Sequence, residues 1–282
     1  MAPMAAVAAL ILIGGVLGAR RLLARPSFDV SPFGKKVLRE GGRRWLHLET
    51  PHFFYHAPDT ERMVLVQDVA EFAYEKVCEY LPGAEPVRKG HVFSVSADMW
   101  DRVLREADRR RDSLAMQAGH EVFVLEGGAP AETSVRLAHE IVHYRVWQLW
   151  GERLPVWLDE GLAGCVGWDI AESFRLRKGW QLSRDWPAAE EGPAVDLAQL
   201  TGFSAYPAPG PEAQLFYRQC EAFVRAIARR IGFAKLPGFV DAQAEGESWD
   251  ACLRGRFAFT DFDFRWLAEE TSRNLAKGGE TK

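Results

Sequence analysis

Residues 133–163 of this 282-residue chain read TSVRLAHEIVHYRVWQLWGERLPVWLDEGLA. Apolar side chains recur at helical spacing over residues 133–150 and again over residues 155–166. Gly151 interrupts the pattern, and a connection this short favours two helices that pack against each other. The stretch therefore predicts a helical hairpin in the middle of the chain.

The first predicted helix contains the motif His139-Glu140-Ile-Val-His143. Two histidines four residues apart lie on one face of a helix, so both imidazoles can bind the same metal ion. Glu140 lies beside the first histidine, where it can take a proton from an attacking water. Zinc takes neutral nitrogen donors and, in catalytic sites, keeps one position open. The motif predicts a zinc site; the alternative is a pair of structural histidines.

A third ligand is expected on the second helix, because catalytic zinc usually takes three protein ligands. Glu160 follows His143 by 17 positions, and the hairpin brings it back across the first helix. The neighbouring Asp159 is equally suited to the favourable charge interaction that acids make near a helix N-terminus. Cys165 is another possible ligand, but a small buried residue is favoured there, since zinc hydrolases leave the fourth position to water.

The two motifs together resemble a known family. HEIVH at 139–143 and PVWLDEGLA at 155–163 are similar to the signature of the gluzincin group of zinc metallopeptidases, which is HExxH followed by P-x-W-L-x-E-G-L-A. The resemblance implies an α+β, zincin-like fold with a mixed α/β N-terminal lobe and a mainly helical C-terminal lobe. It also implies a zinc-dependent enzyme that hydrolyses peptide bonds.

The resemblance carries residue roles as well. It implies that the ligands of Zn²⁺ are His139, His143 and Glu160. It implies that Glu140 is the general base. Many relatives continue the second motif with an acidic and an aromatic residue, whereas this chain has Gly164 and Cys165. The groups that orient the metal ligands are therefore expected to differ from those of relatives.

A peptidase also needs a donor for the oxyanion that develops on the attacked carbonyl. Tyr217, Tyr206 and Tyr144 are the candidates. Tyr217 lies on a predicted helix at 212–231, where similar proteins tend to place a tyrosine. Tyr206 lies in a proline-rich surface connection predicted at 185–211. We expect Tyr217 to be the donor; the alternative is that it is a half-buried packing residue.

The segments around the hairpin predict two lobes. In a mixed lobe at 45–131, alternation predicts strands and helical spacing predicts helices. The strands are expected at 45–49, 52–56, 91–96 and 121–125, and the helices at 62–81 and 98–111. Within a helical lobe at 132–282, further helices are expected at 212–231, 233–244 and 261–276. Five histidines without partner spacing are expected to be structural: His47, His52, His56, His91 and His120.

The N-terminal residues predict a segment that spans a membrane. Residues 2–19 carry no charge and are followed by Arg20, Arg21 and Arg25. A span needs about 17–25 apolar residues, so residues 1–25 predict a single-pass anchor, followed by a linker at 26–44. A cleaved signal peptide and a buried core helix are the alternatives. We expect a membrane localisation. The positive-inside rule favours a cytoplasmic globular part, and a signal peptide would export it.

The charge balance and the cysteine pattern limit the kinds of partner and metal site that are expected. The chain has 35 basic and 39 acidic side chains, and this mixed charge argues against a nucleic-acid binder. Its four cysteines include no Cys-x-x-Cys pair, which argues against a zinc ribbon. The expected partners are a peptide or protein substrate and a membrane, and the oligomeric state stays open. Two other functions remain possible: a non-catalytic zincin-fold binding module in the cell envelope, and a zinc hydrolase of a non-peptide amide.

Overall fold

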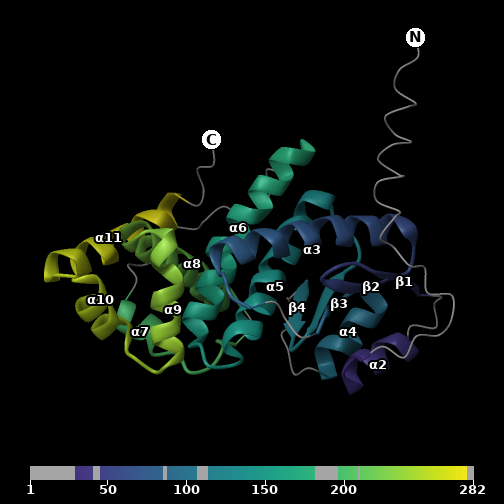
Figure 1. The fold of residues 1–282 in the computed structure, drawn as a ribbon, viewed down its shortest axis with the longest axis horizontal. Coiled ribbons are helices and arrows are strands. Elements are labelled where there is room, and N and C mark those ends of the chain that lie inside the picture. Colours follow the sequence, from purple (N-terminus) through teal and green to yellow (C-terminus); the bar gives the residue numbers. More distant parts are fainter. Residues whose placement is uncertain are drawn as a thin grey trace, which may run out of the picture.

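The computed structural model of the protein describes residues 29–40, 45–84, 88–106, 114–181, 196–208 and 210–277. These residues form one five-stranded mixed sheet and a larger set of helices. Figure 1 shows the sheet at one end of the molecule and the last helices at the other. The predicted α+β class is confirmed at this level.

The sheet has the strand order β1-β2-β3-β5-β4. The strands are β1 (Leu46–Glu49), β2 (Phe53–Ala57), β3 (Gly90–Val95), β4 (Ala115–Ala118) and β5 (Glu121–Leu125). The central strands β2, β3 and β5 are parallel, and β1 and β4 are antiparallel strands at the two edges. The four predicted strands are confirmed. Strand β4 was not predicted, because its sequence AMQA is short and poor in β-branched and aromatic residues.

Helices cover both faces of the sheet. The long helices α3 (Thr60–Tyr80) and α5 (Pro130–Trp150) contact one face. On the other face, apolar side chains of α2 (Pro32–Glu40), α4 (Ala97–Glu106) and the residues next to them form a second, smaller core around Phe93 and Phe123.

Helix α2 lies inside the segment predicted as a linker. The buried carboxylate of Glu121 accepts hydrogen bonds from the backbone N–H of Ser31 at 2.5 Å and from its hydroxyl at 2.8 Å. The Ser31 hydroxyl in turn accepts from the backbone N–H of Gly34 at 3.0 Å. These bonds satisfy the free N–H groups at the start of the helix. Because the capping residue Glu121 lies 90 positions away, no local sequence pattern indicates where the helix begins.

The predicted hairpin is present as α5 and α6 (Val156–Lys178). Helix α6 continues well past the predicted end at residue 166, because buried apolar side chains such as Ile170 and Phe174 extend its packed face. It ends at Gly179, which has the left-handed conformation typical of a helix C-terminus.

The remaining helices pack beyond α6. They are α7 (Leu197–Thr201), α8 (Pro211–Ile231), a short 3-10 turn (Phe233–Lys235), α9 (Leu236–Ala244), α10 (Trp249–Phe257) and α11 (Asp261–Lys277). Helix α8 contacts both α6 and α11. The helices predicted around α8, α9 and α11 are confirmed, whereas α7 and α10 were not predicted. Of the predicted surface connection, residues 185–195 and Pro209 lie outside the described residues.

The predicted membrane localisation is wrong on this structure. Within the described part of the chain, no helix combines the length and the apolar character that crossing a membrane requires. The longest helix, α6, has 23 residues but carries charged side chains, including Asp159, Glu160 and Asp169. The segment 1–25, from which the anchor was predicted, lies outside the described residues.

Candidate metal centre

Three side chains predicted as ligands converge between α5 and α6. The Nε2 atoms of His139 and His143 are 3.1 Å apart. Oε2 of Glu160 lies 3.4 Å from Nε2 of His139 and 3.7 Å from Nε2 of His143. One ligand atom from each residue can be chosen so that all lie within 4.8 Å of one another. No second group of this kind occurs among the described residues, and this one could hold a metal ion.

The site is buried on one side and accessible on the other. His143 and Glu160 are buried, whereas the His139 side chain is 31% exposed. A metal ion bound by the three side chains would therefore be reached from the side of His139.

The charges of the cluster favour a cation. Burial alone would raise the pKa of Glu160, but the neighbouring imidazole of His143 and hydrogen bonds from both histidines hold this pKa well below its ordinary value. Burial likewise opposes a charge on His143, yet Asp159 and Glu160 raise the pKa of His143 well above its usual range. The Glu160 carboxylate thus stays ionised and attracts positive charge to the space between the rings.

Asp159 orients one of the histidines. Nδ1 of His143 donates to Oδ1 of Asp159 at 2.9 Å, which leaves Nε2 facing His139 and Glu160. A carboxylate behind a ligating histidine fixes the ring and raises its basicity. Sequence analysis recognised Asp159 only as an acid near a helix N-terminus. The contact with His143 depends on how α6 crosses α5, which the local sequence does not encode.

We predict that Asp159→Ala lowers metal affinity by about 10–100-fold, because His143 loses the partner that orients it. Asp159→Asn keeps an acceptor oxygen and should lose less. The measurement is zinc competition against a chelator of known affinity. An Asp159→Ala protein that binds zinc as tightly as wild type would contradict this role.

Glycines let α6 approach its neighbours closely enough to place Glu160. A Cβ on Gly161 would lie 2.6 Å from the carbonyl oxygen of Cys220 on α8. A Cβ on Gly167 would lie 2.9 Å from Cα of His139 on α5. Contacts this short leave no room for a larger residue, so the ligand-bearing helix is fixed against both α5 and α8.

The predicted catalytic residues lie on the helices of the hairpin and on α8. Glu140 is buried on α5, next to His139. Tyr217 is partly buried on α8, with its ring 5.8 Å from that of Phe216. It lies one helical turn before Cys220, the residue whose carbonyl approaches Gly161 beside Glu160. Tyr217 is thus on the helix that flanks the candidate ligand Glu160.

The other residues considered for the site are placed differently. Tyr144 is buried in the main core, with its ring 5.4 Å from Phe53, and burial raises its pKa to about 12. Tyr206 is 49% exposed. Cys165 is a buried free thiol, and burial raises its pKa to about 12. It does not belong to the group of possible metal ligands.

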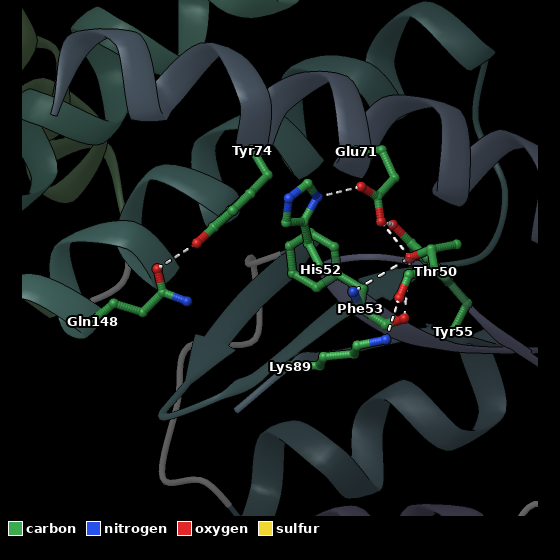
Figure 2. A network of polar contacts seen from close by, with 8 residues as sticks. All are labelled: Thr50, His52, Phe53, Tyr55, Glu71, Tyr74, Lys89 and Gln148. Carbon is green, nitrogen blue, oxygen red and sulfur yellow. Dashed lines mark hydrogen bonds and ion pairs between the residues drawn. The ribbon is translucent and has the colours of Figure 1, made fainter. Parts of the chain in front are cut away.

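His52 belongs to a network that joins α3 to the sheet. Glu71 of α3 accepts from Tyr55 at 3.2 Å and from the Thr50 hydroxyl, and its other oxygen lies 2.5 Å from Nδ1 of His52 (Figure 2). Nζ of Lys89 donates to the carbonyl of Thr50 at 2.6 Å. These contacts fix the turn between β1 and β2 against α3. Within this network, the role of His52 is to hold the fold together.

Comparison of the chain with protein-family models finds no matching family, and comparison with curated proteins finds no similar protein. The function is therefore inferred from the motifs and the geometry of the site.

Proposed function

We propose that this protein is a zinc-dependent metallopeptidase of the gluzincin type, with a zincin-like fold. The observation that carries the proposal is the convergence of two motifs, distant in sequence, on one group of donor atoms: His139, His143 and Glu160. Two imidazoles and a carboxylate suit zinc, and three protein ligands leave a coordination position open for catalysis. The fit of the donor set supports zinc as the metal.

The residues of the site have distinct roles in the proposed reaction. Zinc, when bound, would polarise the attacked carbonyl and increase the acidity of water. His139 and His143 would hold the ion through Nε2, and Asp159 would keep the ring of His143 in place. Glu140 would take a proton from the attacking water and return it to the leaving amine.

The sheet edge supports a peptide as the substrate. Strand β4 is the last strand of the sheet and contacts α5, the helix that carries the histidines. An extended peptide can add to such an edge through backbone hydrogen bonds. A peptide bound along β4 would lie beside α5, the helix that carries His139 and His143.

The experiment combines metal analysis with a hydrolysis assay. We expect wild type to contain about one zinc per chain and Glu160→Ala to lose it while keeping its fold by circular dichroism. A peptide library should be cleaved by wild type, not after treatment with a chelator, and again after zinc is restored. A folded wild-type protein that stays empty in zinc would contradict the proposal.

The assay also separates the two alternative functions. A non-catalytic binding module would bind zinc but cleave no substrate. A hydrolase of non-peptide amides would leave the peptide library intact and turn over simple amides tested beside it.

We predict that Tyr217→Phe lowers kcat by about 10²–10³-fold with little change in KM, because it removes a donor to the oxyanion. Tyr206→Phe, which changes an exposed tyrosine, serves as the matched control and should keep its rate. The measurement is steady-state kinetics on a cleaved peptide. An unchanged rate for Tyr217→Phe would remove this residue from the site.

A further inference from the structure

The two histidines of the metal site differ on their outer sides. Nδ1 of His143 is held by Asp159 at 2.9 Å. Across the described ranges, no hydrogen-bond partner is found for Nδ1 of His139, whose ring contacts are made through Nε2. Ligating histidines almost always donate their other N–H to a carboxylate, a carbonyl or water. His143 has such a carboxylate, and a carboxylate within reach of Nδ1 of His139 would give the second imidazole the same support.

Glu221 of α8 lies over the neighbouring part of α6. Gly164 comes one turn after Glu160 and on the same face of that helix. A Cβ on Gly164 would lie 2.9 Å from Cβ of Glu221 and 3.4 Å from its Oε2. The Glu221 side chain thus occupies the space that a side chain at residue 164 would take.

This face of α6 is also the face that meets His139. Gly167 follows Gly164 by three residues, and a Cβ there would lie 2.9 Å from Cα and 3.1 Å from the backbone nitrogen of His139. Gly164 therefore lies between the ligand Glu160 and the contact with His139. The Glu221 side chain thus lies over α6 three residues before the glycine that contacts the backbone of His139.

One oxygen of Glu221 remains available. Its Oε1 accepts from Nη2 of Arg225 at 3.3 Å, whereas Nη1 of the same guanidinium donates to Asp169 at the shorter distance of 2.8 Å. Among the described residues, no hydrogen bond to Oε2 of Glu221 is found, and the side chain is 34% exposed. A rotation of this side chain can move Oε2 without breaking the stronger pair of Arg225.

We propose that Glu221 is the positioning residue for the metal ligand His139. Its carboxylate accepts the Nδ1–H of His139 when Nε2 binds the metal, as Asp159 does for His143. The inference rests on the proposed function only in that the site binds zinc. It also gives a reason for glycine at residue 164, because a side chain there would displace Glu221.

The test measures zinc affinity of the full chain by competition with a chelator. Glu221→Ala should weaken zinc binding by about 10–100-fold. Glu221→Gln keeps the shape of the side chain without its charge and should give a smaller loss. Adding Gly164→Asp to Glu221→Ala should restore affinity, because it supplies a carboxylate from α6 in the vacated space. A merely structural role of Glu221 would not be rescued in this way.

Asp169→Asn is the matched control, because it removes the shorter ion pair of Arg225 and leaves Glu221 in place. Its zinc affinity should equal that of wild type. The inference is overturned if Glu221→Ala binds zinc like wild type, or if Asp169→Asn weakens binding as much as Glu221→Ala. A wild-type protein that binds no zinc would instead overturn the proposed function. Melting temperatures of the metal-free variants show whether each one is folded.

Discussion

Glu140→Gln is expected to lower kcat for peptide hydrolysis by about 10²–10⁴-fold while zinc content stays at that of wild type. The amide has the shape of the carboxylate but cannot take a proton from water. Glu140 is adjacent to His139 on α5 and is not one of the three residues whose donor atoms converge. Its loss should therefore affect turnover and leave metal binding intact.

The measurement is kcat and KM on one cleaved peptide, with zinc content determined on the same preparation. Glu132→Gln is a matched control on the same helix, since Glu132 pairs with Arg136 at 3.3 Å and has no proposed catalytic role. The control should keep its activity. Normal activity in Glu140→Gln would remove the proposed mechanism, because no other residue has been assigned as the base.

The candidate metal site was predictable because its signal is local. His139 and His143 share a helix face by spacing alone, and a short connection brings Glu160 back to them. The partners of these ligands were not predictable in the same way. Asp159 meets His143, and Glu221 lies over Gly164, only because α5, α6 and α8 cross at particular points.

The same holds for the fold, in which elements with a local sequence pattern were predicted and those that depend on distant contacts were not. Strands and long helices with clear periodicity were predicted, whereas α2 depends on Glu121, a residue far away in the chain. The glycines of α6 lowered its apparent helix propensity and concealed its true length. In the structure Gly161 and Gly164 lie against α8 and Gly167 lies against α5, each too close for an added Cβ. A residue that weakens a helix in isolation thus supports the packing of the site.

Three of the histidines predicted to be structural form a hydrogen-bonded chain across the sheet. Nδ1 of His47 on β1 lies 2.9 Å from Nδ1 of His56 on β2. Nε2 of His56 lies 3.0 Å from Nδ1 of His91 on β3. Their positions in the sequence show no regular spacing, and only the strand register places the imidazoles side by side.

This chain should make the fold sensitive to acid. His56 and His91 are buried. Burial lowers the pKa of His91 to about 3, and the electrostatic influence of the neighbouring His120 and Arg88 adds to this effect. Burial and the neighbouring imidazoles also hold the pKa of His56 well below its ordinary value. Both rings are therefore neutral in the folded protein at pH values where they are protonated in the unfolded chain.

The direction of the effect follows from proton binding. Because the folded-state pKa of His91 lies below its unfolded value of about 6.5, the unfolded chain takes up the proton first as pH falls. Stability is complete above about pH 6.5 and is lost progressively down to about pH 3. Each unit of pKa depression corresponds to about 1.4 kcal/mol, so His91 alone should remove on the order of 5 kcal/mol by pH 3.

We therefore predict that His91→Phe makes the free energy of unfolding less dependent on pH. Between pH 6.5 and 4.5, the variant should lose about 2 kcal/mol less than wild type, because phenylalanine binds no proton. Urea unfolding of the metal-free proteins at both pH values measures this change in the free energy of unfolding. Titration of the metal ligands contributes equally to both proteins and cancels in the comparison. Phenylalanine removes the hydrogen bond between His56 and residue 91 and lowers stability at neutral pH, so the decisive quantity is the slope of stability against pH. The control is His120→Gln, a change at a less buried histidine. Equal slopes of the free energy of unfolding against pH for wild type and His91→Phe would contradict the prediction.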